Sequence, residues 1–410
     1  ARGGFDPVLK VNANTWPVGF YDFRRVEAKI EQATPIWGAS LFGSYRIGTG
    51  NLPVDREEER TLDGGELKAG INLPVWRNGP IDERRAGIRT SEQAAIAAGF
   101  QRDIARLGLL LDGAEAYWKW VAAGRSYKVA LDLVRLAEAR DQQLAEKVRQ
   151  GAVAEIERAE NLRAVLDRRQ DLVVAQRALE QAAFKLSLFI RDNAGEPVVP
   201  TADRLPGLPL PIPPNPDELE VGQAEAMAVR PEIEFYRAEV TRARVSLRLA
   251  ENQVAPELDL SASVAKDLGS NQDSKIIETL DPTEFKLGLT LKLPFLLRKA
   301  RGKRDKAEAK LDEVRQKARF QRDKLITQVL NLWSALNAQA QQSELADETY
   351  RVAEAVAAAE RRRFALGVTT LFIVNLREQK AAEAARKRVK ARADFAFTRS
   401  AWSLATRTQL

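Results

Sequence analysis

The chain has 410 residues, with 64 Lys or Arg against 57 Asp or Glu, and carries a formal net charge of +7. It contains no cysteine and no histidine, which excludes disulfides, thiol catalysis, histidine general bases and zinc fingers. No run of about 18 apolar residues occurs, so any membrane crossing has to be made by strands. The first 30 residues lack the pattern of a signal peptide. We expect no enzyme activity, no cofactor and no metal site.

The first repeat, residues 1–190, contains a pair of two-faced strands followed by helices. TPIWGASLFGSYRIG and ELKAGINLPV alternate apolar with polar or small side chains, and this period of two predicts a β-hairpin over about 34–75. Residues 81–150 contain no proline and are rich in Ala, Leu, Glu, Arg and Gln, which predicts one helix of about 105 Å. Gly151 interrupts this pattern, and a return helix is expected over 155–190.

A connector separates this repeat from the next. Residues 191–216 include eight prolines between Pro197 and Pro216, and proline lacks the backbone donor that helices and central strands need. The segment is therefore predicted to be extended. The alternative for this segment is a ligand for a proline-recognising domain.

The second repeat, residues 217–410, has the same order of elements. We expect a helix over 217–252, a β-hairpin over 257–294, a long helix over 296–366 and a return helix over 371–407. Gly367 follows Lys286 by 81 residues and Gly151 follows Lys68 by 83, at matching places in the two repeats. DPVLKVNA at 6–13 also aligns with APELDLSA at 255–262. An internal duplication explains both matches, and the counterpart of the 217–252 helix is then absent before residue 1.

Four predicted strands raise the question of what covers their apolar faces. In a soluble α+β protein a helix layer would cover them, but helices of about 100 Å extend far beyond a compact sheet. Lipid covers such faces directly, and open strand edges are not tolerated in hydrocarbon. Two copies would give eight strands and a filled interior, whereas three give twelve and a lumen. We therefore predict a mainly α protein with membrane β structure: a homotrimeric twelve-stranded β-barrel continued by an α-helical coiled-coil barrel.

The polar faces of the strands would line this lumen. Lys68, Lys286 and Lys292 point inward by the alternation, and threefold symmetry triples their charge. A modest anion preference is expected, with Asp259 on the same face as an opposing charge. The predicted lumen residues are Lys68, Asn72, Asp259, Lys286, Thr290 and Lys292.

Besides the duplicated unit, four stretches of the chain are distinctive: RPEIEFYRAEVTRARVSLRLAENQVAPELDL, LKLPFLLRKARGKRDKAEAKL, KVRQGAVAEIERA and RRFALGVTTLFIV. With these stretches and the duplicated unit, the whole chain resembles the TolC-like outer-membrane efflux protein family. This resemblance implies a trimeric channel in the outer membrane of a Gram-negative bacterium, with a helical barrel in the periplasm. It also implies a periplasmic adaptor and an inner-membrane transporter as partners. The expected function is passive conduction through the exit duct of a tripartite efflux pump or type I secretion system.

The same resemblance assigns a role to the two glycine turns, which would form a gated periplasmic tip. The implied adaptor-docking residues are Gly151, Ala152, Val153 and Ala154, with Gly367, Val368, Thr369 and Thr370. A plain helix-ending glycine explains Gly151 and Gly367 equally well. The implied gate residues are Glu155, Glu157 and Glu160, with Ile373 and Leu376 forming an apolar constriction in the second turn.

Two other classes of protein compete with the channel. A soluble coiled-coil scaffold would share the helical composition, and an isoelectric point near 9.5 favours nucleic-acid binding. The basic residues are interleaved with acidic ones along the helices, however, and form no long run of one sign. An enzyme lacks any recognisable glycine-rich phosphate loop or paired catalytic acids. We therefore expect no nucleic-acid partner.

Overall fold

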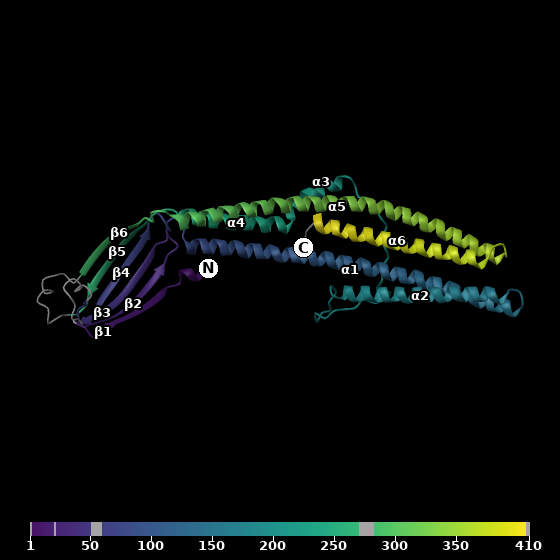
Figure 1. Ribbon diagram of the computed structural model, residues 1–410, viewed down its shortest axis with the longest axis horizontal. Helices are drawn as coiled ribbons and strands as arrows, with labels where there is room; N and C mark the ends of the chain where they lie inside the picture. Colours follow the sequence, from purple (N-terminus) through teal and green to yellow (C-terminus); the bar gives the residue numbers. More distant parts are fainter. Residues whose placement is uncertain (1, 20–21, 51–59, 270–282, 407–410) are drawn as a thin grey trace. The chain divides into compact units, whose positions relative to one another are not determined.

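The computed structural model describes residues 2–19, 22–50, 60–269 and 283–406 (Figure 1). The chain divides into two compact units. The first comprises Ala1–Phe100 and Glu234–Arg319, and the second comprises Gln101–Ile233 and Phe320–Leu410. The predicted return helix to 407 ends one residue outside the described part of the chain. None of the described helices carries an apolar stretch long enough to cross a membrane.

The first unit is built on one antiparallel sheet of six strands in the order β1-β2-β3-β4-β5-β6 (Figure 1). A short 3-10 helix, η1 (Arg2–Phe5), precedes the sheet. The strands are β1 (Val8–Trp16), β2 (Phe23–Ala33), β3 (Ser40–Gly50), β4 (Glu66–Pro74), β5 (Glu257–Asp267) and β6 (Thr283–Lys292). Their alternating sequences explain why they form strands, because each alternation places one apolar set on one face.

The expectation of four strands was wrong, since β1 and β2 add a third hairpin. The 34–75 hairpin itself begins at Ser40, because residues 34–39 turn back at Gly38, whose φ is +71°. β2 reads FRRVEAKIEQA, a composition of Arg, Glu, Ala and Lys that favours helices locally. Pairing with β1 and β3 along its length overrides this preference. The twelve-strand count, which assumed four strands in each copy, therefore no longer follows.

The second unit consists of packed helical hairpins. Pro231 divides the single helix expected over 217–252, because Arg230 before it is extended with ψ 124°. The turn at Gly151 joins α1 to α2, and that at Gly367 joins α5 to α6, so each pair forms one hairpin (Figure 1). The helices of the chain are α1 (Glu83–Arg149), α2 (Glu155–Ser187), α3 (Asp217–Val229), α4 (Pro231–Asn252), α5 (Arg298–Ala365) and α6 (Leu371–Thr406).

Two apolar clusters form the core of this unit. Trp120 and Val121 of α1 pack with Leu186 of α2, and Leu205 of the connector joins them. In the other cluster, Leu336 of α5 packs with Phe395 and Trp402 of α6. Arg125 donates a hydrogen bond from Nε to the carbonyl oxygen of Pro206 at 3.0 Å. The proline-rich connector is thus packed against α1 at Leu205 and Pro206.

Candidate functional site

One face of the six-stranded sheet is apolar from β1 to β6. Cross-strand register places Leu9 opposite Ile30, Ala28 opposite Tyr45, and Leu41 opposite Ile71. The face continues with Ala69 opposite Val264 and Leu260 opposite Leu289. Its large side chains are exposed rather than packed, with Leu9 at 63% and Leu289 at 68%. An apolar surface of this extent marks a contact with lipid or with another protein.

The opposite face of the sheet is polar and charged. All six predicted lumen residues lie on it: Lys68, Asn72, Asp259, Lys286, Thr290 and Lys292. Asn72, Asp259, Thr290 and Lys292 line one hollow of about 690 Å³. Asn72 also lines a second hollow of about 720 Å³, together with Lys68 and Lys286. The structure therefore brings the predicted residues together on one surface.

Ion pairs neutralise much of the positive charge on this polar face. Lys292 contacts Glu257 at 2.9 Å, and Lys286 contacts Glu284 at 2.9 Å. Among the described residues, the side chain of Lys68 makes no ion pair or hydrogen bond. Of the three lysines expected to attract anions, Lys68 is therefore the one whose charge is least compensated.

The two turns of the second unit have the same backbone geometry. Gly151 and Gly367 adopt φ values of +72° and +71°, a left-handed conformation that glycine adopts without steric cost. Their amides donate to Val148 and Phe364, while the next amides donate to Lys147 and Arg363. This pair of hydrogen bonds closes a helix C-terminus as a Schellman motif. The predicted docking residues Gly151–Ala154 and Gly367–Thr370 form these two turns.

The predicted gate residues begin the two helices that follow the turns. Glu155 and Glu157 lie in the first turn of α2, where the helix dipole favours negative charge, and Glu160 pairs with Arg163 at 2.8 Å. In α6, Ile373 is half-buried and Leu376 is 37% exposed. Both carboxylates and apolar side chains are thus available next to the turns.

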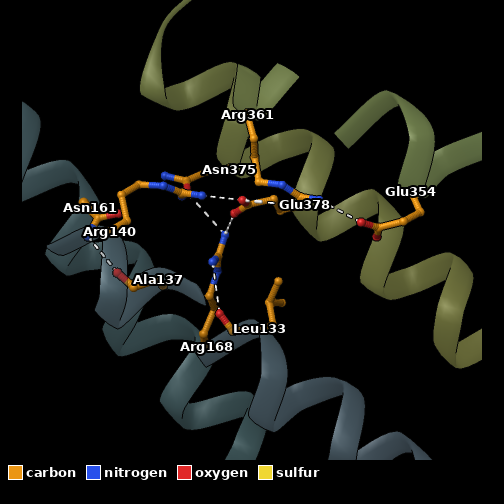
Figure 2. Close-up of polar contacts among 9 residues, drawn as sticks. All are labelled: Leu133, Ala137, Arg140, Asn161, Arg168, Glu354, Arg361, Asn375 and Glu378. Carbon is orange, nitrogen blue, oxygen red and sulfur yellow. Dashed lines mark hydrogen bonds and ion pairs between the residues drawn. The ribbon is translucent and has the colours of Figure 1, made fainter. Parts of the chain in front are cut away.

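A buried polar cluster, which the sequence analysis did not predict, joins the two helical hairpins of the second unit (Figure 2). At its centre is Glu378 of α6, only 2% exposed. Arg140 of α1 binds its Oε1, and Arg168 of α2 donates to its Oε2 at 2.9 Å. We call Arg140, Arg168, Asn375 and Glu378 the buried cluster.

Asn375 and two neighbouring groups complete the hydrogen bonding of the buried cluster. The Asn375 side-chain oxygen accepts from Arg140 at 2.8 Å and from Arg168 at 3.1 Å. Arg168 also donates to the Leu133 carbonyl oxygen at 3.2 Å. Arg361 of α5 approaches Glu378 at 3.8 Å and pairs with Glu354 at 2.7 Å (Figure 2). All four helices of the two hairpins therefore contribute to one network.

The charge of the buried cluster is unbalanced. Two arginines, each less than 10% exposed, share the single carboxylate of Glu378. Burial lowers the pKa of the Arg168 guanidinium, because desolvation disfavours its charged form, while the negative charge of Glu378 acts in the opposite direction. Glu378 is thus the group on which both buried cations depend.

The spacing of buried positions along α6 and α2 contains a signal for this cluster. Leu371, Val374 and Ala381 are buried positions of α6, and Glu378 continues their three- and four-residue spacing. On α2, Arg168 similarly follows the buried Asn161 and Val165. A charged residue within an otherwise buried helical stripe needs a buried partner of opposite charge.

Comparisons with known proteins identify the fold. Residues 224–405 match the family described as outer membrane efflux protein. This part of the chain is therefore similar to that family. This confirms the resemblance predicted from the sequence, and the family is one of transport proteins rather than enzymes.

Three solved structures share the fold of this chain. The outer membrane protein VceC of Vibrio cholerae is 15% identical, with TM-score 0.66 over 98% of this chain and 86% of its own. The open-state MtrE outer membrane channel of Neisseria gonorrhoeae is 16% identical, with TM-score 0.63 over 99% and 81%. The CmeC outer membrane channel of Campylobacter jejuni is 16% identical, with TM-score 0.63 over 98% and 78%. No curated protein matches the sequence.

Proposed function

We propose that this protein is the outer-membrane exit duct of a tripartite efflux pump or type I secretion system. The observation that carries the proposal is the two-faced sheet. Its apolar face is exposed across all six strands, and its other face bears charges and hollows suited to a wet lumen. The family match supports the same function.

The duct would be a homotrimer in the outer membrane of a Gram-negative bacterium, with its helical part in the periplasm. A single sheet with two open edges needs sister copies, because unpaired backbone groups are not tolerated in lipid. The turns at Gly151 and Gly367 would dock a periplasmic adaptor, which links the duct to an inner-membrane transporter. Conduction is passive, and the partners supply the energy.

Extraction from membranes tests the proposed function against the soluble coiled-coil scaffold. The duct is expected to require detergent, to purify as an oligomer and to conduct ions in planar bilayers. A monomer that is soluble in plain buffer and binds DNA in a salt-sensitive way would contradict the proposal.

The gate is proposed to lie beside the two turns, where apolar and charged side chains close the resting pore. The doubly substituted Ile373→Ala, Leu376→Ala variant is expected to conduct more than the wild type in planar bilayers, because its shorter side chains widen the constriction. Val174→Ala is the control, since Val174 is 70% exposed on α2 away from the turns. Equal conductance in all three proteins would contradict a gate at these residues.

The Lys68→Glu variant is expected to shift the reversal potential across a salt gradient toward cation selectivity. The reason is that Lys68 is the least compensated lysine of the polar face, and the change removes one positive charge and adds a negative one in each copy. Lys266→Glu makes the same charge change on the opposite face of the sheet, since Lys266 pairs with Leu67. If the wild type is cation-selective and the Lys68→Glu variant has the same selectivity, the predicted anion preference is wrong.

A further inference from the structure

We propose that β1 of one copy pairs with β6 of the next, so that each copy contributes six strands and three copies close a wall of eighteen. This inference rests on the proposed function, which supplies the threefold assembly. It concerns the surface by which one copy recognises another. The proposed occupant of each open edge is thus a second copy of this chain.

The β1–β2 hairpin is an integral part of the sheet. β2 pairs with β3 over all eleven of its residues, from Phe23 opposite Gly50 to Ala33 opposite Ser40. β1 pairs with β2 over all nine of its residues. On the polar face, Lys10 bridges the two strands to Glu31 at 3.1 Å. The hairpin is therefore joined to β3 as fully as the other strands are joined to each other.

The β1–β2 hairpin also continues both the apolar face and the polar face of the sheet. Leu9, Val11 and Ala13 of β1 extend the apolar face. Residues of β2 bring Arg25, Glu27 and Lys29 to the polar face, where Lys29 lies 4.5 Å from the ring centroid of Phe42 on β3. A hairpin lying outside a membrane wall would not need a lipid-type face and a lumen-type face in register with the neighbouring strands.

The two edge strands of the sheet, β1 and β6, are both open to pairing with another strand. Edge strands of soluble sheets are usually blocked by proline, by several charges or by a covering segment. β1 has no proline and a single charge at Lys10, and all nine of its residues are exposed. β6, with ten residues and no proline, is also exposed along nearly all of its length. β6 carries three charged residues, Glu284, Lys286 and Lys292, and both lysines are held in ion pairs. The two edges match in length, and neither contains a proline.

The directions of the two edge strands also permit pairing between copies. Neighbouring strands alternate from β1 to β6, so β1 and β6 run in opposite directions. Repeating this six-stranded unit around a ring therefore gives antiparallel pairing at each junction between copies. A ring of about eighteen strands leaves an aqueous channel, as the larger porins do. The lumen is incomplete without the neighbouring copy, because each copy forms one third of its wall.

Cysteine cross-linking tests the junction, because the chain contains no cysteine of its own. Asn12→Cys on β1 is combined in turn with Lys286→Cys, Gly288→Cys or Thr290→Cys on β6, which samples several registers on the polar face. A thiol-reactive cross-linker of roughly 8 Å is applied to the membrane-embedded oligomer. Within one copy the two positions are about 24 Å apart along the sheet at 4.8 Å per strand. Covalent dimers and trimers on a denaturing gel are expected from at least one pair.

The control places the first cysteine on β3, as Ser44→Cys with Gly288→Cys. If β3 is the true edge of the wall, this cysteine pair gives covalent dimers and trimers, and the pairs that include Asn12→Cys on β1 do not. That result overturns the eighteen-stranded wall while leaving a trimeric channel. Absence of membrane insertion and of conductance would instead contradict the proposed function. Mass measurement of the cross-linked complex distinguishes three copies from the two that would close a twelve-stranded ring, and two copies would also overturn the inference.

Discussion

Replacing Glu378 by alanine is expected to lower the free energy of unfolding of the helical unit by about 3–5 kcal/mol, because it leaves buried charges without their partner. Both Arg140 and Arg168 bind this carboxylate, and each is less than 10% exposed. For a unit of this size the loss corresponds to a fall in Tm of roughly 6–20 °C. Thermal unfolding followed by circular dichroism measures it.

Glu383→Ala is the matched control for this substitution. Glu383 lies on the same helix and pairs with Lys380 at 3.0 Å, but Lys380 is exposed and Glu383 is only half-buried. Such surface pairs contribute about 0–1 kcal/mol, so Tm is expected to change little. If Glu378→Ala and Glu383→Ala are equally stable, the buried cluster does not hold the two hairpins together.

An apolar replacement separates stability from gating at the buried cluster. Arg140→Met, Arg168→Met and Glu378→Leu together remove all three charges, and buried ion pairs are often replaced by well-packed apolar side chains at little cost. The triple variant is therefore expected to recover most of the stability that Glu378→Ala loses. If the polar network also fixes a closed arrangement of the hairpins, this stable variant conducts more than the wild type in planar bilayers.

The strands that sequence reasoning found are those with the strongest alternation. EFKLGLTLKLPF places leucine or phenylalanine at every second position, a pattern that only a two-faced strand explains. β2 alternates as well, but its apolar side chains are Val26, Ala28 and Ile30 among Arg, Glu and Lys. Its local composition does not distinguish a strand from a solvated helix, and the pairing that decides the matter is non-local. The alignment of residues 6–13 with 255–262 was the available clue to β1.

The two glycine turns could be predicted from local sequence, whereas the buried cluster could not. Gly151 and Gly367 were predicted because a left-handed helix end favours glycine, which is a local requirement. The cluster depends on which faces of α1, α2 and α6 meet, and Arg140 and Glu378 are 238 residues apart in sequence. No local rule gives that contact. Only the position of a charge within a buried stripe indicates that a partner is needed.

The apolar face of the six-stranded sheet is the surface proposed to contact lipid. Leu289→Arg is expected to reduce the amount of protein inserted in the outer membrane strongly, because arginine on the lipid face of a barrel costs about 2–4 kcal/mol at mid-membrane and every copy carries the substitution. Leu289 is 68% exposed and lies opposite Leu260 on the apolar face. Membrane fractionation and the yield of folded oligomer measure the effect.

Thr290→Arg is the matched control, since it introduces the same side chain one residue later on the polar face. Thr290 lies opposite Asp259, so an arginine at this position would face the proposed lumen with a carboxylate nearby, and insertion is expected to remain close to that of the wild type. Equal insertion of the two variants would show that the apolar face does not contact lipid. If Thr290→Arg alone blocks insertion, the two faces are reversed, and the charged residues from Lys10 to Lys292 would lie outside the lumen. The contrast between these adjacent positions therefore tests the direction of the sheet without depending on the number of strands in the wall.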